Sequence, residues 1–185
     1  NGVVSITVLK PNGEIDGVVG SCETDTHGKF ECPVELQKGQ EFKKTWFQIQ
    51  ILGGTYLDEA SGERVALQEP VRAWVGESVG NDLQNVAVDF LSETQVRRHL
   101  LQLALAKSSQ INIADLWDKV REGQKQLAEL FGVEAMAAAA DIRDLSSMDK
   151  ESRTTARTLL MAGFAQWSKQ VGLAQSVLSD LIAKD

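Results

Sequence analysis

The side chains best suited to catalysis are few in this chain of 185 residues. It holds only two histidines, His27 and His99, and two cysteines, Cys22 and Cys32. The phosphate-binding pattern Gly-x-x-x-x-Gly-Lys-Ser/Thr, the dinucleotide-binding pattern Gly-x-Gly-x-x-Gly and the zinc-protease pattern His-Glu-x-x-His are all missing. Two isolated cysteines cannot complete a four-ligand zinc site by themselves. We therefore predict a non-enzymatic protein with no catalytic residue, no metal site and no cofactor; the weakest alternative is a hydrolase with an unfamiliar motif.

Each histidine has a simpler explanation than catalysis. His27 falls at the tip of a predicted hairpin, where the turn conformation accounts for it. His99 follows Arg97 and Arg98 in a stretch with helical periodicity. We expect this basic triplet to lie on a solvated or boundary face of the helix.

The two cysteines flank a predicted β-hairpin. If its three-residue loop ends in Gly28 with left-handed backbone angles, Asp25 faces Lys29. Counting outward from that pair, Cys22 faces Cys32, and directly opposed residues of an antiparallel pair lie at the Cα separation that a disulfide requires. We predict a disulfide that contributes about 2–3 kcal/mol and indicates an oxidising compartment. The alternatives are two buried free thiols or a metal pair that lacks further ligands.

Candidate ligand contacts gather around a glycine turn. Gly53 and Gly54 allow the chain to turn after a predicted strand, and Tyr56 follows them. Trp46 falls on the more polar face of that strand, so it is the tryptophan that we expect to be exposed. Trp46, Gly53, Gly54 and Tyr56 are therefore the candidate residues for binding a glycan or another small solute.

The other aromatic and acidic residues are expected to serve the fold. Trp117 and Trp167 lie on apolar helical stripes, which favours core packing. The acidic pairs Glu23/Asp25 and Asp58/Glu59 lack the dense alternating spacing of a calcium loop. We expect these carboxylates to serve turn geometry and solubility.

Short strands must position these residues in the first half of the chain. Alternating or apolar runs separated by Gly- and Pro-containing turns predict strands in the following places: 4–9, 15–22, 29–34, 46–51, 63–67, 71–75 and 83–89. Strands at roughly ten-residue spacing with such turns are typical of a β-sandwich. We predict an antiparallel β-sandwich domain over residues 1–90.

The pattern changes to helical periodicity near Phe90. The run from Ser92 to Gln95 has the form of a capping box. We expect later helices to begin at Asn112 and at Ser146 or Ser147, and a terminal helix to follow Gly172. Each has one apolar face, so we predict an α-helical bundle domain over residues 91–185 and, for the whole chain, an α+β fold.

Composition limits the partners. Nineteen basic and 26 acidic residues give a net charge of −7, which opposes binding of nucleic acid or anionic membranes over the whole surface. No apolar run approaches the roughly 20 residues that span a bilayer. Because the chain starts at Asn1 and not at methionine, we expect a processed or trimmed product, and any export signal or lipid anchor would lie upstream.

The first half resembles bacterial extracytoplasmic domains of the carboxypeptidase-regulatory-like, transthyretin-like type. Their Thr-Asp-x-x-Gly-x-Phe/Tyr hairpin is matched from Thr24 to Phe30. The run from Gly53 to Gly62, with helical segments containing Leu130-Phe131-Gly132-Val133 and Asp141-Ile142, is similar to a group of bacterial secreted proteins and lipoproteins. Many relatives have Thr-Pro-Leu-Thr where this chain has Val88-Asp89-Phe90-Leu91, so the junction between its halves is expected to differ. The cysteine pair is an addition to the group's pattern.

The resemblance implies a transthyretin-like or immunoglobulin-like sandwich at the periplasm, outer membrane or cell surface. The function we expect is a non-enzymatic interaction or structural module of a bacterial envelope, with another envelope or surface protein as partner. Binding would use an exposed strand edge or the junction between the halves. The alternative is a receptor for a glycan or another small solute.

Overall fold

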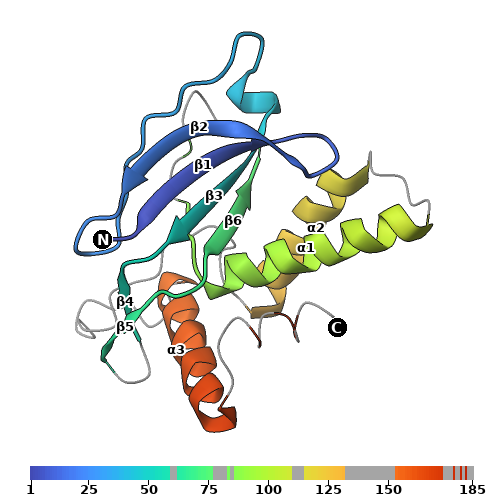
Figure 1. The fold of residues 1–185 in the computed structure, drawn as a ribbon. Coiled ribbons are helices and arrows are strands. Elements are labelled where there is room, and N and C mark those ends of the chain that lie inside the picture. Colours follow the sequence, from blue (N-terminus) through green and yellow to red (C-terminus); the bar gives the residue numbers. More distant parts are fainter. Residues whose placement is uncertain are drawn as a thin grey trace.

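The computed structural model describes residues 1–58, 62–76, 83, 86–109, 115–131, 153–172, 177, 180 and 182. Antiparallel strands come first and three helices follow (Figure 1), which confirms the α+β prediction. The elements are β1 (Val3–Leu9), β2 (Ile15–Glu23), the 3-10 helix η1 (Phe42–Lys44), β3 (Trp46–Leu52), β4 (Thr55–Leu57), β5 (Arg64–Ala66), β6 (Val71–Val75), α1 (Phe90–Ser109), α2 (Leu116–Phe131) and α3 (Arg153–Val171).

Four strands form one antiparallel sheet in the order β2-β1-β3-β6. Ile6 of β1 lies opposite Ile49 of β3, which in turn lies opposite Ala73 of β6. This register places buried apolar side chains in one row across the three strands. Strands β4 and β5 form a separate two-stranded hairpin.

One face of the sheet is covered by extended chain. Its core consists of Val4, Ile6, Val8, Val19, Phe47 and Ile49. Phe30, Cys32, Val34 and Leu36 pack on this core from residues 29–36, and Leu83, Val86 and Val88 pack on it from the approach to α1. Neither segment forms a strand at its described residues. Since the described part of the chain contains no second sheet facing the first, the sandwich stays a prediction.

The other face of the sheet is covered by helices. Trp46 and Trp74 of the sheet share a core with Val96 and Leu103 of α1 and with Val120 of α2. A third cluster joins the start of α1 to α3 through Phe90, Leu91 and Met161. The helices thus pack on the sheet as well as on one another, and Figure 1 shows α1 running beside β6. A helical bundle, and a domain boundary at residue 90, stay predictions.

The predicted turn from Asp25 to Lys29 and the predicted disulfide are confirmed, but the β-hairpin is not, because the returning segment is not a strand. The Asp25 amide donates to the Lys29 carbonyl at 2.8 Å, and Gly28 has a φ of 78°. Cys22 and Cys32 are bonded, with their Cα atoms 5.2 Å apart. The Asp25 carboxylate accepts hydrogen bonds from the amides of Lys29 and His27, and these bonds lower its pKa.

Three local predictions are wrong. The segment 83–89 is not a strand at its described residues, 83 and 86–89. Residues 29–34 do not form a strand, although Phe30, Cys32 and Val34 share the inward side as expected; the segment is tied to β2 by a bond from the Glu35 amide to the Val19 carbonyl. Helix α1 does not begin at Ser92. It begins at Phe90, because Asp89 and Ser92 exchange two backbone-to-side-chain hydrogen bonds one turn earlier.

Several sequence predictions lie outside the described residues. They are the caps at Asn112 and at Ser146 or Ser147, the Gly132-Val133 and Asp141-Ile142 matches, and most of the terminal helix. Helix α3 ends where expected, with Gly172 at a φ of 66°. Within the described chain, no helix is both long and apolar enough to cross a membrane.

Candidate binding cavity between the β4–β5 hairpin and helices α1 and α3

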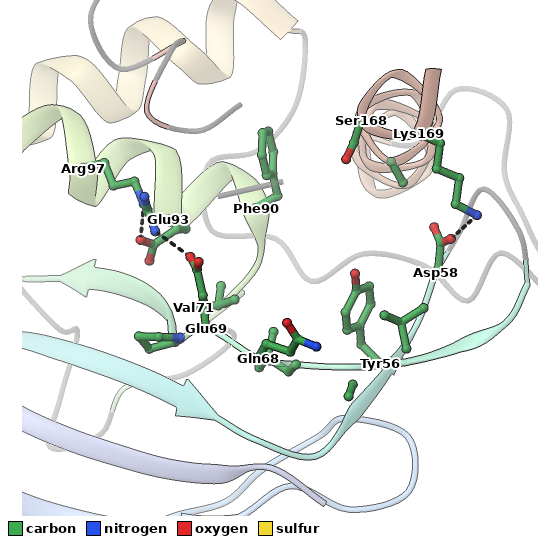
Figure 2. Close-up of a pocket in the computed structure, with 15 residues that line it drawn as sticks. Tyr56, Asp58, Gln68, Glu69, Val71, Phe90, Glu93, Arg97, Ser168 and Lys169 are labelled. Carbon is green, nitrogen blue, oxygen red and sulfur yellow. Dashed lines mark hydrogen bonds and ion pairs between the residues drawn. The ribbon is translucent and has the colours of Figure 1, made fainter. Parts of the chain in front are cut away.

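A cavity of about 360 Å³ lies where the sheet half meets the helical half. Strands β4 and β5 and the extended chain from Leu67 to Val71 form one wall. Phe90, Glu93 and Arg97 of α1 and the last turns of α3 form the other (Figure 2). The wall is mainly apolar with polar groups at intervals, which is the usual character of a ligand-binding pocket.

A buried carboxylate organises the α1 side of the cavity. Glu93 is only 3% exposed, and one of its oxygens accepts hydrogen bonds from the Arg72 backbone amide at 2.8 Å and from Arg72 Nε at 3.1 Å. Its other oxygen accepts from Arg72 Nη2 at 2.6 Å and from Arg97 Nε at 2.7 Å. One side chain therefore joins the edge strand β6 to the first turns of α1. Charge-assisted bonds of this kind are the strong ones, and they fix geometry.

Arg97 is held by three carboxylates. Besides Glu93, its guanidinium contacts Asp180 at 2.8 Å and Glu69 at 3.5 Å. Burial alone would lower the pKa of Arg97, but the hydrogen bonds to Asp180 and Glu93 outweigh burial and raise it. Arg97 therefore stays charged, and it links the chain between β5 and β6 to α1.

A second ion pair joins the hairpin to α3. Asp58 directly follows β4 and is 4% exposed, and its carboxylate contacts Lys169 Nζ at 2.5 Å. The backbone around Asp58 is held by a turn in which its carbonyl accepts from the Gly62 amide, and Gly62 has a φ of 70°. Tyr56, two residues before Asp58, lines the same cavity (Figure 2).

The predicted ligand residues do not come together as one site. Tyr56 lines the cavity, whereas Trp46, Gly53 and Gly54 do not. Gly54 has a φ of 74°, and a Cβ on it would lie 2.5 Å from the Asn1 carbonyl oxygen. Its glycine is thus explained by a left-handed turn and by close packing against the start of the chain.

The expectation that Trp46 is exposed is wrong. Its side chain is 8% exposed and stacks on Trp117 of α2, with ring centroids 4.5 Å apart. Gly76 lies against the indole, and Arg121 lies over it at 5.7 Å. The polar neighbours of Trp46 on its strand misled the prediction, because Gln48 is itself buried and accepts a hydrogen bond from Trp74 Nε1.

Three further side chains lie differently from expectation. His99 was expected on a solvated or boundary face but is only 2% exposed, whereas Arg97 is part-buried, as a boundary position implies. Trp167, expected in a core, is 43% exposed. Asp58 was expected to serve a turn and solubility; it does take part in a turn, but its carboxylate is buried in an ion pair.

One motif match needs a structural test. Gly76-Glu77-Ser78-Val79-Gly80 fits the Gly-x-Ser-x-Gly pattern of hydrolases, in which serine sits on a sharp turn between a strand and a helix. Strand β6 does end at Val75, but residues 77–82 lie outside the described residues. Residues 83 and 86–89 are not helical, and α1 begins only at Phe90. The structure therefore leaves this match untested, because Ser78 itself lies outside the described residues.

The residues that shape the cavity could only partly be found from the sequence. Glu93 was recognised only as a member of a capping motif, and Lys169 carried no signal because its partner Asp58 is more than a hundred positions away. Within the described residues, no group of three or more His, Cys, Asp or Glu side chains is placed to hold a metal ion. The cavity's charged groups are engaged with one another, so the arrangement is suited to holding shape and recognising a ligand.

Comparison with known proteins adds no assignment. No family model matches the sequence, no curated protein matches it, and no solved structure matches the fold. The likeness to carboxypeptidase-regulatory-like domains therefore stays an expectation drawn from the motifs.

Proposed function

We propose that the protein is a non-enzymatic binding module of a bacterial envelope, and that it recognises its partner through the cavity between the β4–β5 hairpin and helices α1 and α3. The observation that carries this proposal is the cavity itself, which takes one wall from each half of the chain. A partner that enters it would contact both halves at once. The partner we propose is another envelope or surface protein.

The sheet edges favour the cavity over strand addition as the mode of binding. Along β2, the outer side is occupied by residues 29–36, which the disulfide and the Glu35-to-Val19 bond hold in place. Along β6, the Arg72 amide donates to Glu93 and the Arg72 carbonyl accepts from the Ser92 hydroxyl. Backbone groups that already have partners cannot pair with an incoming strand.

The cavity's electrostatics favour recognition over catalysis. A general acid or base needs a pKa tuned toward the working pH and access to the reacting group. Here Glu93 accepts four hydrogen bonds, and Asp58 is paired with Lys169. These carboxylates are occupied in holding β6, α1, the hairpin and α3 together.

The disulfide supports an extracytoplasmic location, since such bonds persist in oxidising compartments and are rare in the cytosol. The same part of the chain carries the hairpin motif of transthyretin-like sandwich domains. We therefore include a transthyretin-like sandwich in the proposal, together with a helical bundle for the second half.

A small-solute receptor is the second candidate, and the cavity's size favours it. Pockets for small ligands commonly measure about 300–1,000 Å³, and this cavity measures about 360 Å³. Tyr56 and Phe90 offer aromatic surface, and Gln68 and Ser168 offer polar atoms. A small amphipathic molecule would use both kinds of contact.

An occluding substitution tests both candidates. Ala66 of β5 is exposed and lines the cavity, so Ala66→Phe places a ring in its mouth at little cost in stability. Val18→Phe, on the exposed side of β2 away from the cavity, is the matched control. Binding of a panel of small amphipathic fragments is followed by ligand-observed NMR. We expect a tenfold or greater loss of affinity in Ala66→Phe alone.

Binding of a protein partner is tested by photo-cross-linking in the native envelope. One variant carries a photoactivatable residue at position 66, in the cavity wall, and the control variant carries it at position 18. A discrete adduct at position 66 and none at position 18 is the expected result. If fragments bind both variants equally and the adducts are the same at both positions, the cavity is not the recognition site.

A further inference from the structure

His99 lies at the point where three elements meet. It belongs to α1, its ring stacks on Trp74 of β6 with centroids 5.9 Å apart, and α2 passes over it at Gly123. A Cβ added to Gly123 would lie only 3.2 Å from His99 Cε1. Glycine at this helix position, unfavourable by about 1 kcal/mol relative to alanine, thus lets α2 pack directly on the imidazole.

The imidazole is buried with one nitrogen unpaired. Nδ1 lies 3.2 Å from Gln102 Oε1, so it carries the proton of the neutral ring in this pairing. Nε2 is the only buried side-chain nitrogen or oxygen in the described chain that has no hydrogen-bond partner. A second proton would therefore create a cation in the core, with a new N–H that faces no acceptor among the described residues.

Among the described residues, no carboxylate acts on the imidazole. The described groups that face the ring are Trp74 from β6 and Gly123 from α2, both uncharged, and Gln102 from its own helix. The nearest acting charge is the cation of Arg98. Burial lowers the pKa of His99 to about 4, the Gln102 hydrogen bond opposes this shift, and Arg98 adds to it.

We propose that His99 is an acid-sensitive latch, which holds α2 against α1 and the sheet while its ring is neutral and releases α2 when the ring is protonated. Val120 and Trp117 of α2 are the apolar side chains that release would uncover, together with the face of Trp46 on which Trp117 stacks. The latch is separate from the binding cavity, since none of the described residues that line the cavity belongs to α2.

The lowered pKa of His99 sets how the stability of the packed state changes with pH. The neutral ring stabilises the packed state above the ordinary histidine pKa of about 6.5, and this contribution is lost as the pH falls from there toward 4. Lowering the pKa of His99 from 6.5 to about 4 in the packed state changes the ratio of packed to released α2 by on the order of 100-fold between pH 7 and pH 4. The carboxylates of Asp and Glu also titrate between pH 7 and pH 4. The test therefore compares variants that carry the same carboxylates and differ only at a histidine.

The experiment follows hydrogen exchange of the full chain at pH 7 and pH 4, corrected for the intrinsic exchange rate, with tryptophan fluorescence as a second readout. In the unmodified protein, we expect α2 to lose protection on acidification by on the order of 100-fold while β1 and β3 stay protected. His99→Phe keeps a ring against Trp74 but does not titrate, so most of that loss should disappear. His27→Phe, on the exposed hairpin, should behave like the unmodified protein.

Two results would overturn the latch. One is the same acid response of α2 in His99→Phe and in the unmodified protein. The other is simultaneous loss of protection in α2, β1 and β3, which indicates general acid unfolding. If His99→Phe does not fold, NMR titration of the unmodified protein decides, since the chain gives only two histidine signals. A midpoint for His99 near 6.5 would refute the proposal.

Discussion

Replacing Glu93 by alanine should destabilise the protein more than any surface charge substitution. The carboxylate accepts four hydrogen bonds, three from Arg72 of β6 and one from Arg97 of α1, and it is almost fully buried. Its loss leaves the part-buried guanidinium group of Arg72 without its acceptor and removes one of the three carboxylates around Arg97. Removing one partner of a buried ion pair typically costs about 3–5 kcal/mol.

The structure favours the lower end of that range. Arg97 keeps Asp180 and Glu69 after the substitution, and Arg72 retains some access to solvent. We therefore expect a loss of about 3 kcal/mol in the free energy of unfolding. For a chain of this size that corresponds to a fall of about 6–12 °C in melting temperature. Glu93→Gln keeps the shape and one acceptor oxygen, so its loss should be smaller.

Urea unfolding followed by tryptophan fluorescence measures these losses. The matched control is Glu41→Ala, which removes an exposed pair with Lys44 at 3.1 Å and should cost less than about 1 kcal/mol. The view that Glu93 joins β6 to α1 would be refuted if Glu93→Ala lost no more unfolding free energy than Glu41→Ala. The slope of the unfolding free energy against urea concentration must be the same in both variants for this comparison.

Two further predictions concern the sheet. Gly54→Ala should lower the melting temperature clearly more than Gly53→Ala. Both glycines have a positive φ, but only at Gly54 would the new Cβ meet the chain at Asn1. Equal falls in melting temperature would contradict this packing. Removing the Cys22–Cys32 disulfide, by reduction or by double alanine substitution, should lower the free energy of unfolding by about 2–3 kcal/mol and speed hydrogen exchange in residues 29–36. Unchanged exchange there would show that the bond does not hold this segment.

Local pattern was sufficient where the structure depends on neighbours in sequence. The prediction of the turn from Asp25 to Lys29 needed only a loop length and the left-handed preference of Gly28, and the disulfide followed by counting residues. Strand β6 was predicted at its observed bounds from alternation and turns. The returning strand was not, because alternation shows which side chains point inward but not whether the backbone finds a partner strand.

Burial of polar groups was the main failure of the sequence reasoning. Residues 91–96 of α1 are all buried, including Glu93 and Gln95, so the helix has no simple apolar stripe at its start. Their burial depends on Arg72 and on α3, which are distant in sequence. Gly123 shows the same limit: the sequence marks it as a weak helix position, and only the packing of His99 explains it. Trp46 was misplaced because the helix that covers it lies some seventy positions later.

A crystal structure of the protein soaked with small amphipathic fragments tests the proposed cavity most directly. We predict fragment density between Tyr56 and Phe90, with the Asp58–Lys169 and Glu93–Arg97 pairs kept in place. Fragments that bind only elsewhere, in crystals whose packing leaves this cavity open, would contradict the claim that the junction of the two halves is the binding site.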